Sequence, residues 1–177
     1  MEIYIDSKRI YEGKILNLRV DTVEISRNGR HATREVVEHR SAVAILARDE
    51  NGKLLLVRQY RYPVQAELIE IPAGIMEMGE EPLEAAQREL REETGYSAEK
   101  WTAIPPIYST PGFSDEKLYM FMAEGLRWDP LTQDEDEDIS LIRCSEEEAR
   151  DMLCAQKTQD AKTMAALAIY FATKNNA

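Results

Sequence analysis

The segment GIMEMGEEPLEAAQRELREETGY, residues 74–96, places the tightest limits on how this chain can fold. Pro82 suits the first turn of a helix, and Gly95 suits the left-handed position that ends one. The apolar residues between them recur at helical spacing and predict a core-facing side: Leu83, Ala86 and Leu90. We therefore expect one amphipathic helix here, with acidic residues bunched at its end.

These acidic residues repel one another. On a helix, Glu89 and Glu93 would lie one turn apart on one side, with Glu92 beside them. Each like-charge pair destabilises a helix by roughly 0.2–0.5 kcal/mol, and the negative end of the helix dipole adds to this. Arg88 and Arg91 offset part of the charge, and such an oxygen-rich cluster also suits a hard divalent cation such as Mg²⁺. On charge alone, a plain solvated acidic helix is equally acceptable.

The spacing of the polar residues separates these alternatives. The segment runs from Gly74 through five residues to Glu80, and then through seven residues to RELREETGY. This resembles the Nudix box, G-x5-E-x7-R-E-U-x-E-E-x-G-U, at every fixed position; U is an aliphatic residue, and Tyr96 is the one departure. The resemblance implies a hydrolase of nucleoside diphosphates linked to another moiety. It also implies an α/β (α+β) fold, a mixed β-sheet sandwiched between α-helices, with the box as a loop–helix–loop.

In the Nudix hydrolases the box binds metal, and the resemblance carries these roles onto matching residues. The implied metal ligands are the Ala73 backbone carbonyl, Glu89 and Glu93. Glu92 would be a further acidic ligand or near-ligand with a catalytic part, Arg88 would orient the glutamates, and Glu80 would support them. The implied cation is Mg²⁺, with Mn²⁺ as a substitute.

A second diagnostic lies outside the box, where Pro111 stands sixteen residues after Gly95 within YSTPGFSDE. This placement resembles the bacterial ADP-ribose (ADP-sugar) pyrophosphatases. The likeness covers nearly the whole chain, including TREVVEHR, RQYR, ELIEIPAG, the box and DAKTMAALAIYF. The substrate-binding residues that it implies are Tyr11, Arg34, Arg61, Glu70, Pro111 and Phe113.

These residues are expected to act in different ways. Arg61 offers a fork for phosphate oxygens, with Arg34 as a second contact. Glu70 would lie near the metal or the polar groups of the ligand, and Tyr11 would stack on adenine. From the residues alone, plainer interpretations stay open: a basic strand end for RQYRYP, a solvent-facing Glu70, and core positions for Tyr11 and Phe113.

The run DEDED at residues 134–138 has the composition of a solvated loop tip. In the ADP-ribose pyrophosphatase group, a glutamate of the matching loop acts on the attacking water and another reaches the metals. In the frame set by Ile139, the resemblance implies Glu135 as general base and Glu137 as a metal ligand. Adjacent acids leave that frame open by one or two residues. The other candidates for the base are Glu80, Glu92 and Glu116.

The rest of the chain predicts short strands and two further helices. Residues 1–40 alternate apolar and polar side chains around Asn28-Gly29, which predicts an N-terminal β-hairpin. Strands are expected at residues 41–49, 53–61, 66–74 and 139–145, a strand–loop–strand at 102–126, and helices at 145–155 and 161–174. The hairpin is too small to bury a core of its own. The resemblance implies a segment 1–40 exchanged in a homodimer and a Nudix domain at 41–177.

Composition limits the partners. A formal net charge of −11 opposes nonspecific binding of nucleic acid or anionic lipid. No apolar run approaches the roughly 20 residues of a membrane span, and the N-terminus has no signal-peptide pattern. Two cysteines make neither a disulfide framework nor a zinc cluster, so we expect a cytoplasmic protein.

The expected activity is Mg²⁺-dependent hydrolysis of ADP-ribose, with other ADP-sugars as further substrates, to AMP and ribose 5-phosphate. One alternative is a pyrophosphatase for another nucleotide sugar such as GDP-mannose. The other is a sensor that binds a nucleotide without cleaving it. The box retains all of its carboxylates, which favours catalysis.

Overall fold

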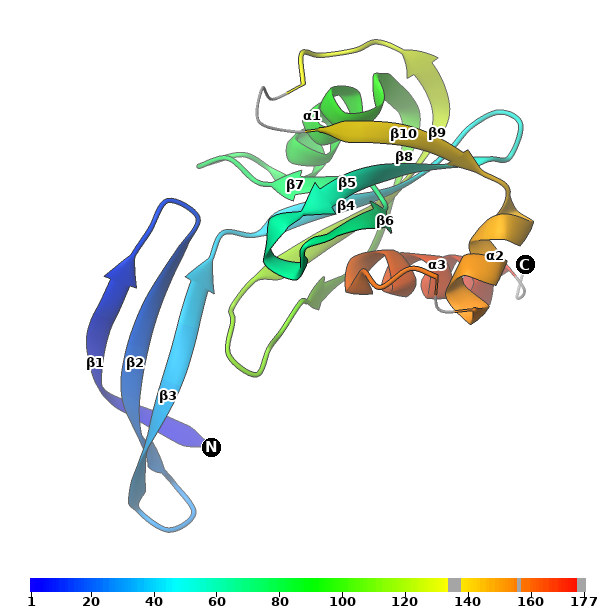
Figure 1. The fold of residues 1–177 in the computed structure, drawn as a ribbon. Helices are drawn as coiled ribbons and strands as arrows, with labels where there is room; N and C mark the ends of the chain where they lie inside the picture. Colours follow the sequence, from blue (N-terminus) through cyan, green and yellow to red (C-terminus); the bar gives the residue numbers. More distant parts are fainter. Residues whose placement is uncertain (134–137, 156, 175–177) are drawn as a thin grey trace. The chain divides into compact units, whose positions relative to one another are not determined.

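The computed structural model describes residues 1–133, 138–155 and 157–174 (Figure 1). These residues form two compact units. The first is Met1–Ser41 together with Tyr108–Lys117, and the second is Ala42–Ile107 together with Leu118–Ala177. Among the helices of the described residues, none has the length and hydropathy needed to cross a membrane.

The first unit is an antiparallel sheet in the order β1-β2-β3. Its strands are β1 (Glu2–Glu12), β2 (Leu16–Ile25) and β3 (Arg30–His39). The hairpin predicted around Asn28-Gly29 is confirmed, because β2 pairs with β3 from Leu16↔His39 to Ile25↔Arg30. Gly29 has a positive φ of 66°, which glycine adopts without strain. The structure adds β1 as a third strand, which the sequence did not separate from the hairpin.

The loop predicted between the two strands of residues 102–126 belongs to this first unit, which includes Tyr108–Lys117. The Val37 amide donates to the Phe113 carbonyl over 2.7 Å, and the Asp115 amide donates to the Val37 carbonyl over 3.2 Å. The His39 amide donates to Oδ1 of Asp115 over 2.8 Å. Strand β3 therefore holds the segment that contains Pro111 and Phe113.

The second unit is built on a mixed sheet in the order β10-β5-β4-β9-β8. Its strands are β4 (Ala42–Arg48), β5 (Leu54–Arg61), β6 (Ala66–Glu70), β7 (Ala73–Ile75), β8 (Tyr96–Tyr108), β9 (Lys117–Trp128) and β10 (Ile139–Cys144), and a 3-10 turn η1 (Tyr62–Val64) follows β5. Strand β4 runs parallel to β9 and antiparallel to β5. The sheet is therefore mixed, as expected.

Strands β4 and β5 pair directly only next to their turn, at Ala47↔Leu55 and Arg48↔Leu54. Beyond that point β6 pairs with β5, and β7 pairs with β4. The sequence predicted one strand over residues 66–74, but the structure divides it at Pro72, which has no amide hydrogen to give to a ladder. The Pro72 carbonyl instead accepts a hydrogen bond from the Ile45 amide over 2.8 Å. This arrangement brings β7 to the centre of the sheet.

Helices cover both faces of this sheet (Figure 1). On one face α1 (Pro82–Thr94) packs through Ala86 and Leu90 against Val43 and Ile45. The opposite face carries α2 (Glu146–Cys154) and α3 (Ala161–Lys174), where Leu167 joins the core. Alternate side chains of β4 are thus buried on opposite sides, which explains its continuous apolar sequence. The expected fold class, a mixed sheet between helices, is confirmed.

The ends of α1 agree with the sequence, and one of its core positions does not. Pro82 lies in the first turn, and Gly95 ends the helix with a φ of 78°. Ala86 and Leu90 are fully buried, but Leu83 is 40% exposed, so its predicted place in the core was wrong. Ala85 is buried in its stead, because the face that meets the sheet lies closer to the carboxylate side of the helix than the apolar spacing indicated.

Candidate metal and diphosphate site

Arg88 gathers three carboxylates around one guanidinium on α1. Its Nε and Nη2 each donate to the Glu80 carboxylate over 3.0 Å, and its Nη1 donates to Glu89 over 2.7 Å and to Glu92 over 2.8 Å. The hydrogen bonds that Arg88 donates to Glu80, followed by those that it donates to Glu89 and Glu92, raise its pKa above its ordinary value. Arg88 therefore stays charged and fixes the directions in which these carboxylates point.

Glu89 and Glu93 are buried against the start of β7. They are 8% and 7% exposed, low values for carboxylates. The Ala73 amide donates to Oε2 of Glu93 over 3.0 Å. At the next residue, Gly74, a β-carbon would overlap the Glu89 carboxylate, so only glycine leaves room for it. Two buried carboxylates thus lie against two successive residues of one strand.

Arg61 and Glu70 form a buried ion pair on β5 and β6. Arg61 donates through Nε over 2.8 Å and through Nη2 over 2.7 Å to the two oxygens of Glu70, which is 1% exposed. Burial raises the pKa of Glu70, but the bonds and charges of Arg61 and Lys162 outweigh it and leave the pKa below its ordinary value. The solvent-facing alternative for Glu70 was therefore wrong.

Arg61 also belongs electrostatically to the glutamate cluster. The hydrogen bonds to Glu70 raise its pKa most, and the negative charges of Glu93 and Asp160 add to the rise. Its side chain is 40% exposed, so part of the guanidinium faces solvent. A partly exposed arginine beside buried carboxylates is suited to bind an anionic ligand, such as a phosphate, that is accompanied by bound metal cations.

The other implied substrate residues belong to the first unit. Tyr11 and Phe113 are 57% and 55% exposed, so the alternative that placed them in a core was wrong. Arg34 forms an ion pair with Glu2, and its Nε donates to Oε2 of Glu2 over 3.0 Å. Pro111 is exposed in a turn in which the Phe113 amide donates to the Thr110 carbonyl over 3.1 Å. The side chains of Tyr11, Pro111 and Phe113 are therefore exposed, whereas the guanidinium of Arg34 is engaged by Glu2.

Glu135 and Glu137, the implied base and metal ligand of the acidic run, lie outside the described residues. Among the residues that are described, no group of three or more His, Cys, Asp and Glu side chains is arranged to hold a metal ion. The residues present still fit a hard divalent cation in kind, because Glu89 and Glu93 are buried oxygen donors beside a glycine that keeps the space for them.

Two residues of this site were missed by the sequence analysis. Lys162 forms ion pairs with Glu70 and, over 3.0 Å, with Asp160. Asp160 directly precedes α3, and Lys162 lies in its first turn, 92 residues after Glu70. Their one signal in the sequence was the segment DAKT, which formed part of the wider resemblance.

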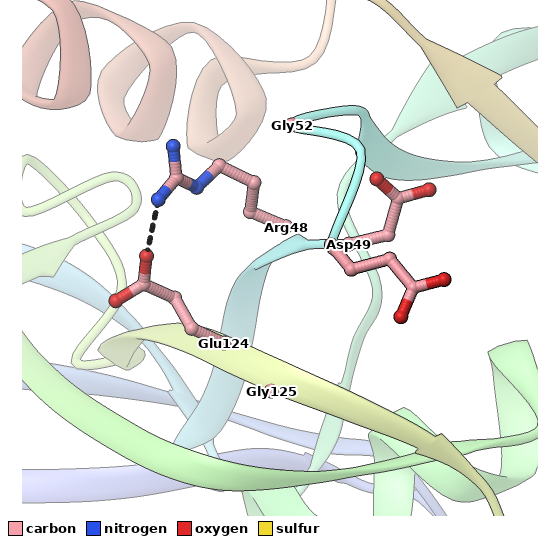
Figure 2. A pocket seen from close by; sticks show the side chains of 6 residues that line it. Arg48, Asp49, Gly52, Glu124 and Gly125 are labelled. Atoms are coloured by element: carbon pink, nitrogen blue, oxygen red, sulfur yellow. Dashed lines mark hydrogen bonds and ion pairs between the residues drawn. The ribbon is translucent and has the colours of Figure 1, made fainter.

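A separate hollow lies at the other end of β4 (Figure 2). Its lining residues are Arg48, Asp49, Glu50, Gly52, Glu124 and Gly125. Arg48 donates to Glu124 over 2.7 Å, and Asp49 accepts hydrogen bonds from the amides of Asn51 and Lys53 that close the β4–β5 turn. The polar groups of this hollow thus hold the fold together, and it does not compete with the glutamate cluster as a site.

Comparison with known proteins identifies the family of the chain. The model of the NUDIX domain matches residues 38–167. The chain is 42% identical over 165 residues to an ADP-ribose pyrophosphatase of Bacillus subtilis, covering 92% of this chain and 89% of the relative. It is 38% identical over 165 residues, with the same coverage, to a methanol dehydrogenase activator of Bacillus methanolicus.

A crystal structure of an ADP compounds hydrolase has the same fold. It superposes with a TM-score of 0.89 at 23% identity and covers 99% of this chain and 95% of its own. The matched residues 38–167 include Arg88 with the glutamates around it, and the start of β7, where the Ala73 amide bonds to Glu93. The chain belongs to the NUDIX domain family.

Proposed function

We propose that this protein hydrolyses the diphosphate of ADP-ribose, and of other ADP-sugars, to AMP and a sugar phosphate, with Mg²⁺ as cofactor and Mn²⁺ as a substitute. For ADP-ribose the second product is ribose 5-phosphate. The observation that carries the proposal is the buried pair Glu89 and Glu93 beside the half-exposed Arg61, in a chain 42% identical to an ADP-ribose pyrophosphatase.

The residues that would hold the cation are the Ala73 carbonyl, Glu89 and Glu93, with Glu137 from outside the described part of the chain. When bound, the cation would neutralise the diphosphate and lower the pKa of a water molecule. Arg88 supports this arrangement because it holds Glu89 and Glu92 from the side through hydrogen bonds of 2.7 and 2.8 Å. Glu92 is a further ligand or near-ligand in this proposal.

Arg61 binds the diphosphate in this proposal. Its Nε and Nη2 are engaged by Glu70, whereas its Nη1 makes no hydrogen bond to any of the described residues. The N–H groups of Nη1 can therefore donate to phosphate oxygens without breaking the pair with Glu70. Glu135 would accept the proton of the attacking water as general base. The water oxygen joins one phosphorus while the bridging P–O bond breaks.

In this proposal, residues of the first unit bind the nucleotide end of the substrate. Tyr11 and Phe113 present exposed rings on which adenine could stack, with Pro111 in the same turn as Phe113 and Arg34 as a second cation. We propose that residues 1–40 are exchanged in a homodimer and complete the partner's site. The exposed apolar side chains of β1 support this: Ile3, Tyr4, Ile5, Ile10 and Tyr11.

The net charge of −11 opposes nucleic acid and membrane partners and fits the cytoplasm.

A substrate panel tests the proposal. ADP-ribose is incubated with the protein with and without Mg²⁺, beside GDP-mannose, NADH and diadenosine polyphosphates, and the products are separated by chromatography. We expect AMP and ribose 5-phosphate to form from ADP-ribose only when Mg²⁺ is present. Faster turnover of GDP-mannose would support the alternative nucleotide-sugar pyrophosphatase. Binding of ADP-ribose without turnover of any compound would support the sensor alternative.

A further inference from the structure

Residues 158–163, which lead into α3 and form its first residues, contact the last two residues of β6, Ile69 and Glu70, and the next residue, Ile71. Thr158 Oγ1 donates to the Ile69 carbonyl over 3.1 Å, and the Ile71 amide donates to Thr163 Oγ1 over 2.8 Å. Between them, Lys162 forms an ion pair with the side chain of Glu70. One short stretch of chain therefore holds the end of β6 through both backbone and side-chain contacts. These contacts end at Ile71, two residues before Ala73, whose amide donates to Glu93.

Lys162 is itself held in place. Its Nζ donates to Oδ1 of Asp160 over 3.0 Å, and its side chain is 12% exposed. The other oxygen of Asp160 accepts the Thr163 amide over 3.0 Å and so caps the first turn of α3. The ammonium of Lys162 thus occupies a position fixed by the start of the helix rather than by a flexible surface chain.

The charges around Glu70 balance only when Lys162 is counted. Arg61 and Lys162 are cations, and Glu70 and Asp160 are anions, so the four side chains are neutral together. Without Lys162 the positive charge of Arg61 would be the counter-charge of a carboxylate that is 1% exposed. A buried carboxylate without its full counter-charge is destabilised. Arg61 would then be less available to an anionic ligand, and the site as a whole would be more negative.

We infer that Lys162 is a positioning residue for Arg61: it neutralises and orients Glu70, and Glu70 presents Arg61 to the diphosphate. This inference rests on the proposed function, because it takes a diphosphate to be the ligand of Arg61. A residue that only stabilised the fold would lower the population of folded protein equally for every substrate and step. A residue that acts through Arg61 changes the affinity for the anion and depends on Arg61.

The kinetic test uses Lys162→Met, which keeps the length of the side chain without its charge. We expect KM for ADP-ribose to rise about tenfold and kcat to change less than about threefold, because charge-assisted bonds to the substrate are weakened. Lys162→Arg restores the charge and should return KM to within about threefold of the parent. Lys174→Met is the matched control: it removes a lysine ion pair from the last turn of the same helix, with Glu146, and should leave KM unchanged.

A double-mutant cycle identifies the residue through which Lys162 acts. In an Arg61→Met background, Lys162→Met should change kcat/KM by less than about twofold, because the residue that it positions is gone. An equal loss in both backgrounds would overturn the inference, and so would a loss confined to kcat. All variants are compared at temperatures where their circular dichroism shows the same folded fraction.

An NMR measurement keeps the inference separate from the substrate. The Nε–H of Arg61, assigned through its absence in Arg61→Lys, should exchange slowly in the parent and in Lys162→Arg because it is bonded to Glu70. Lys162→Met should speed this exchange by about tenfold or more. Unchanged exchange would refute the role of Lys162 whatever the substrate. A parent protein that cleaves no ADP-sugar would refute the proposed function and leave this measurement to decide the inference.

Discussion

The backbone amide of Ala73 donates a hydrogen bond to Oε2 of Glu93 over 3.0 Å, and this bond joins β7 to the last turn of α1. The bond orients the carboxylate of Glu93, which lies one helical turn from Glu89 and repels it. The pair of buried charges is therefore held by the strand and by Arg88, and the helix end keeps its shape with an acidic cluster on it.

Glu93→Gln should abolish activity while it leaves the fold intact. The amide oxygen can still accept the hydrogen bond of Ala73, but the charge that would bind a cation is lost. We expect kcat/KM to fall by several orders of magnitude in saturating Mg²⁺, and the melting temperature without metal to rise slightly as like-charge repulsion is relieved. Glu147→Gln, an exposed glutamate of α2, is the control and should keep its activity. Near-normal turnover of Glu93→Gln would disprove the metal-site assignment.

Gly74→Ala should displace Glu89. The added methyl group would occupy the space of the Glu89 carboxylate, so we expect a loss of about 1–3 kcal/mol in the free energy of unfolding, together with much weaker dependence of the rate on Mg²⁺. Urea denaturation and metal titration measure the two effects. In a Glu89→Ala background the same methyl group meets no carboxylate, and the stability loss should disappear. If it persists there, the overlap with Glu89 is not its cause.

Glu135→Gln tests the proposed general base. Glutamine keeps the size of the side chain but cannot accept a proton, so kcat should fall about 10²–10⁴-fold with little change in KM or metal affinity. Glu137→Gln should weaken the Mg²⁺ dependence as well as the rate. Asp134→Asn and Asp136→Asn are the controls and should stay within a few-fold of the parent. Comparably small effects of neutral substitutions throughout residues 134–138 would move the search for the base to Glu80, Glu92 and Glu116.

Glu124→Gln should make stability less dependent on pH without affecting activity. Lys100 donates to Glu124 over 2.8 Å, and Arg48 donates to it over 2.7 Å (Figure 2). Both bonds lower the pKa of Glu124 below its ordinary value in the folded protein. A carboxyl with a lowered folded pKa stabilises the protein above its unfolded pKa, and this is lost as pH falls through the folded pKa. The parent should exceed the variant by roughly 1 kcal/mol or less at neutral pH. Urea denaturation should show the difference shrinking as pH falls below the unfolded pKa of about 4.3 and vanishing below the lowered folded pKa.

Light scattering tests the exchange of residues 1–40. The exposed apolar side chains of β1 should be covered by a second copy of the chain, so we expect a mass twice the 20.3 kDa of the monomer at micromolar concentration. Replacement of Ile3 and Ile10 by serine should weaken the dimer and lower activity together. A monomer with full activity would exclude an exchanged segment that completes the partner's site.

The sequence by itself determined the features that depend on neighbours along the chain. The positions of Pro82 and Gly95 fixed both ends of α1. The spacing of Glu89 and Glu92 brought both carboxylates within reach of Arg88, because the 3.6-residue period of a helix is a property of the backbone. The capping box from Ser145 to Glu148 at the start of α2 followed from the same local geometry.

Only the tertiary structure decided which distant side chains meet. Glu70 receives its second counter-charge from Lys162, 92 residues later, and no local pattern announces that pairing. Leu83 is exposed although its spacing predicted burial, whereas Ala85 lies on the face of α1 that packs against the sheet. Secondary-structure periods are set residue by residue, whereas ion pairs and buried faces depend on how strands and helix starts pack. The fold class and the box were therefore predictable, and the support behind Arg61 was not.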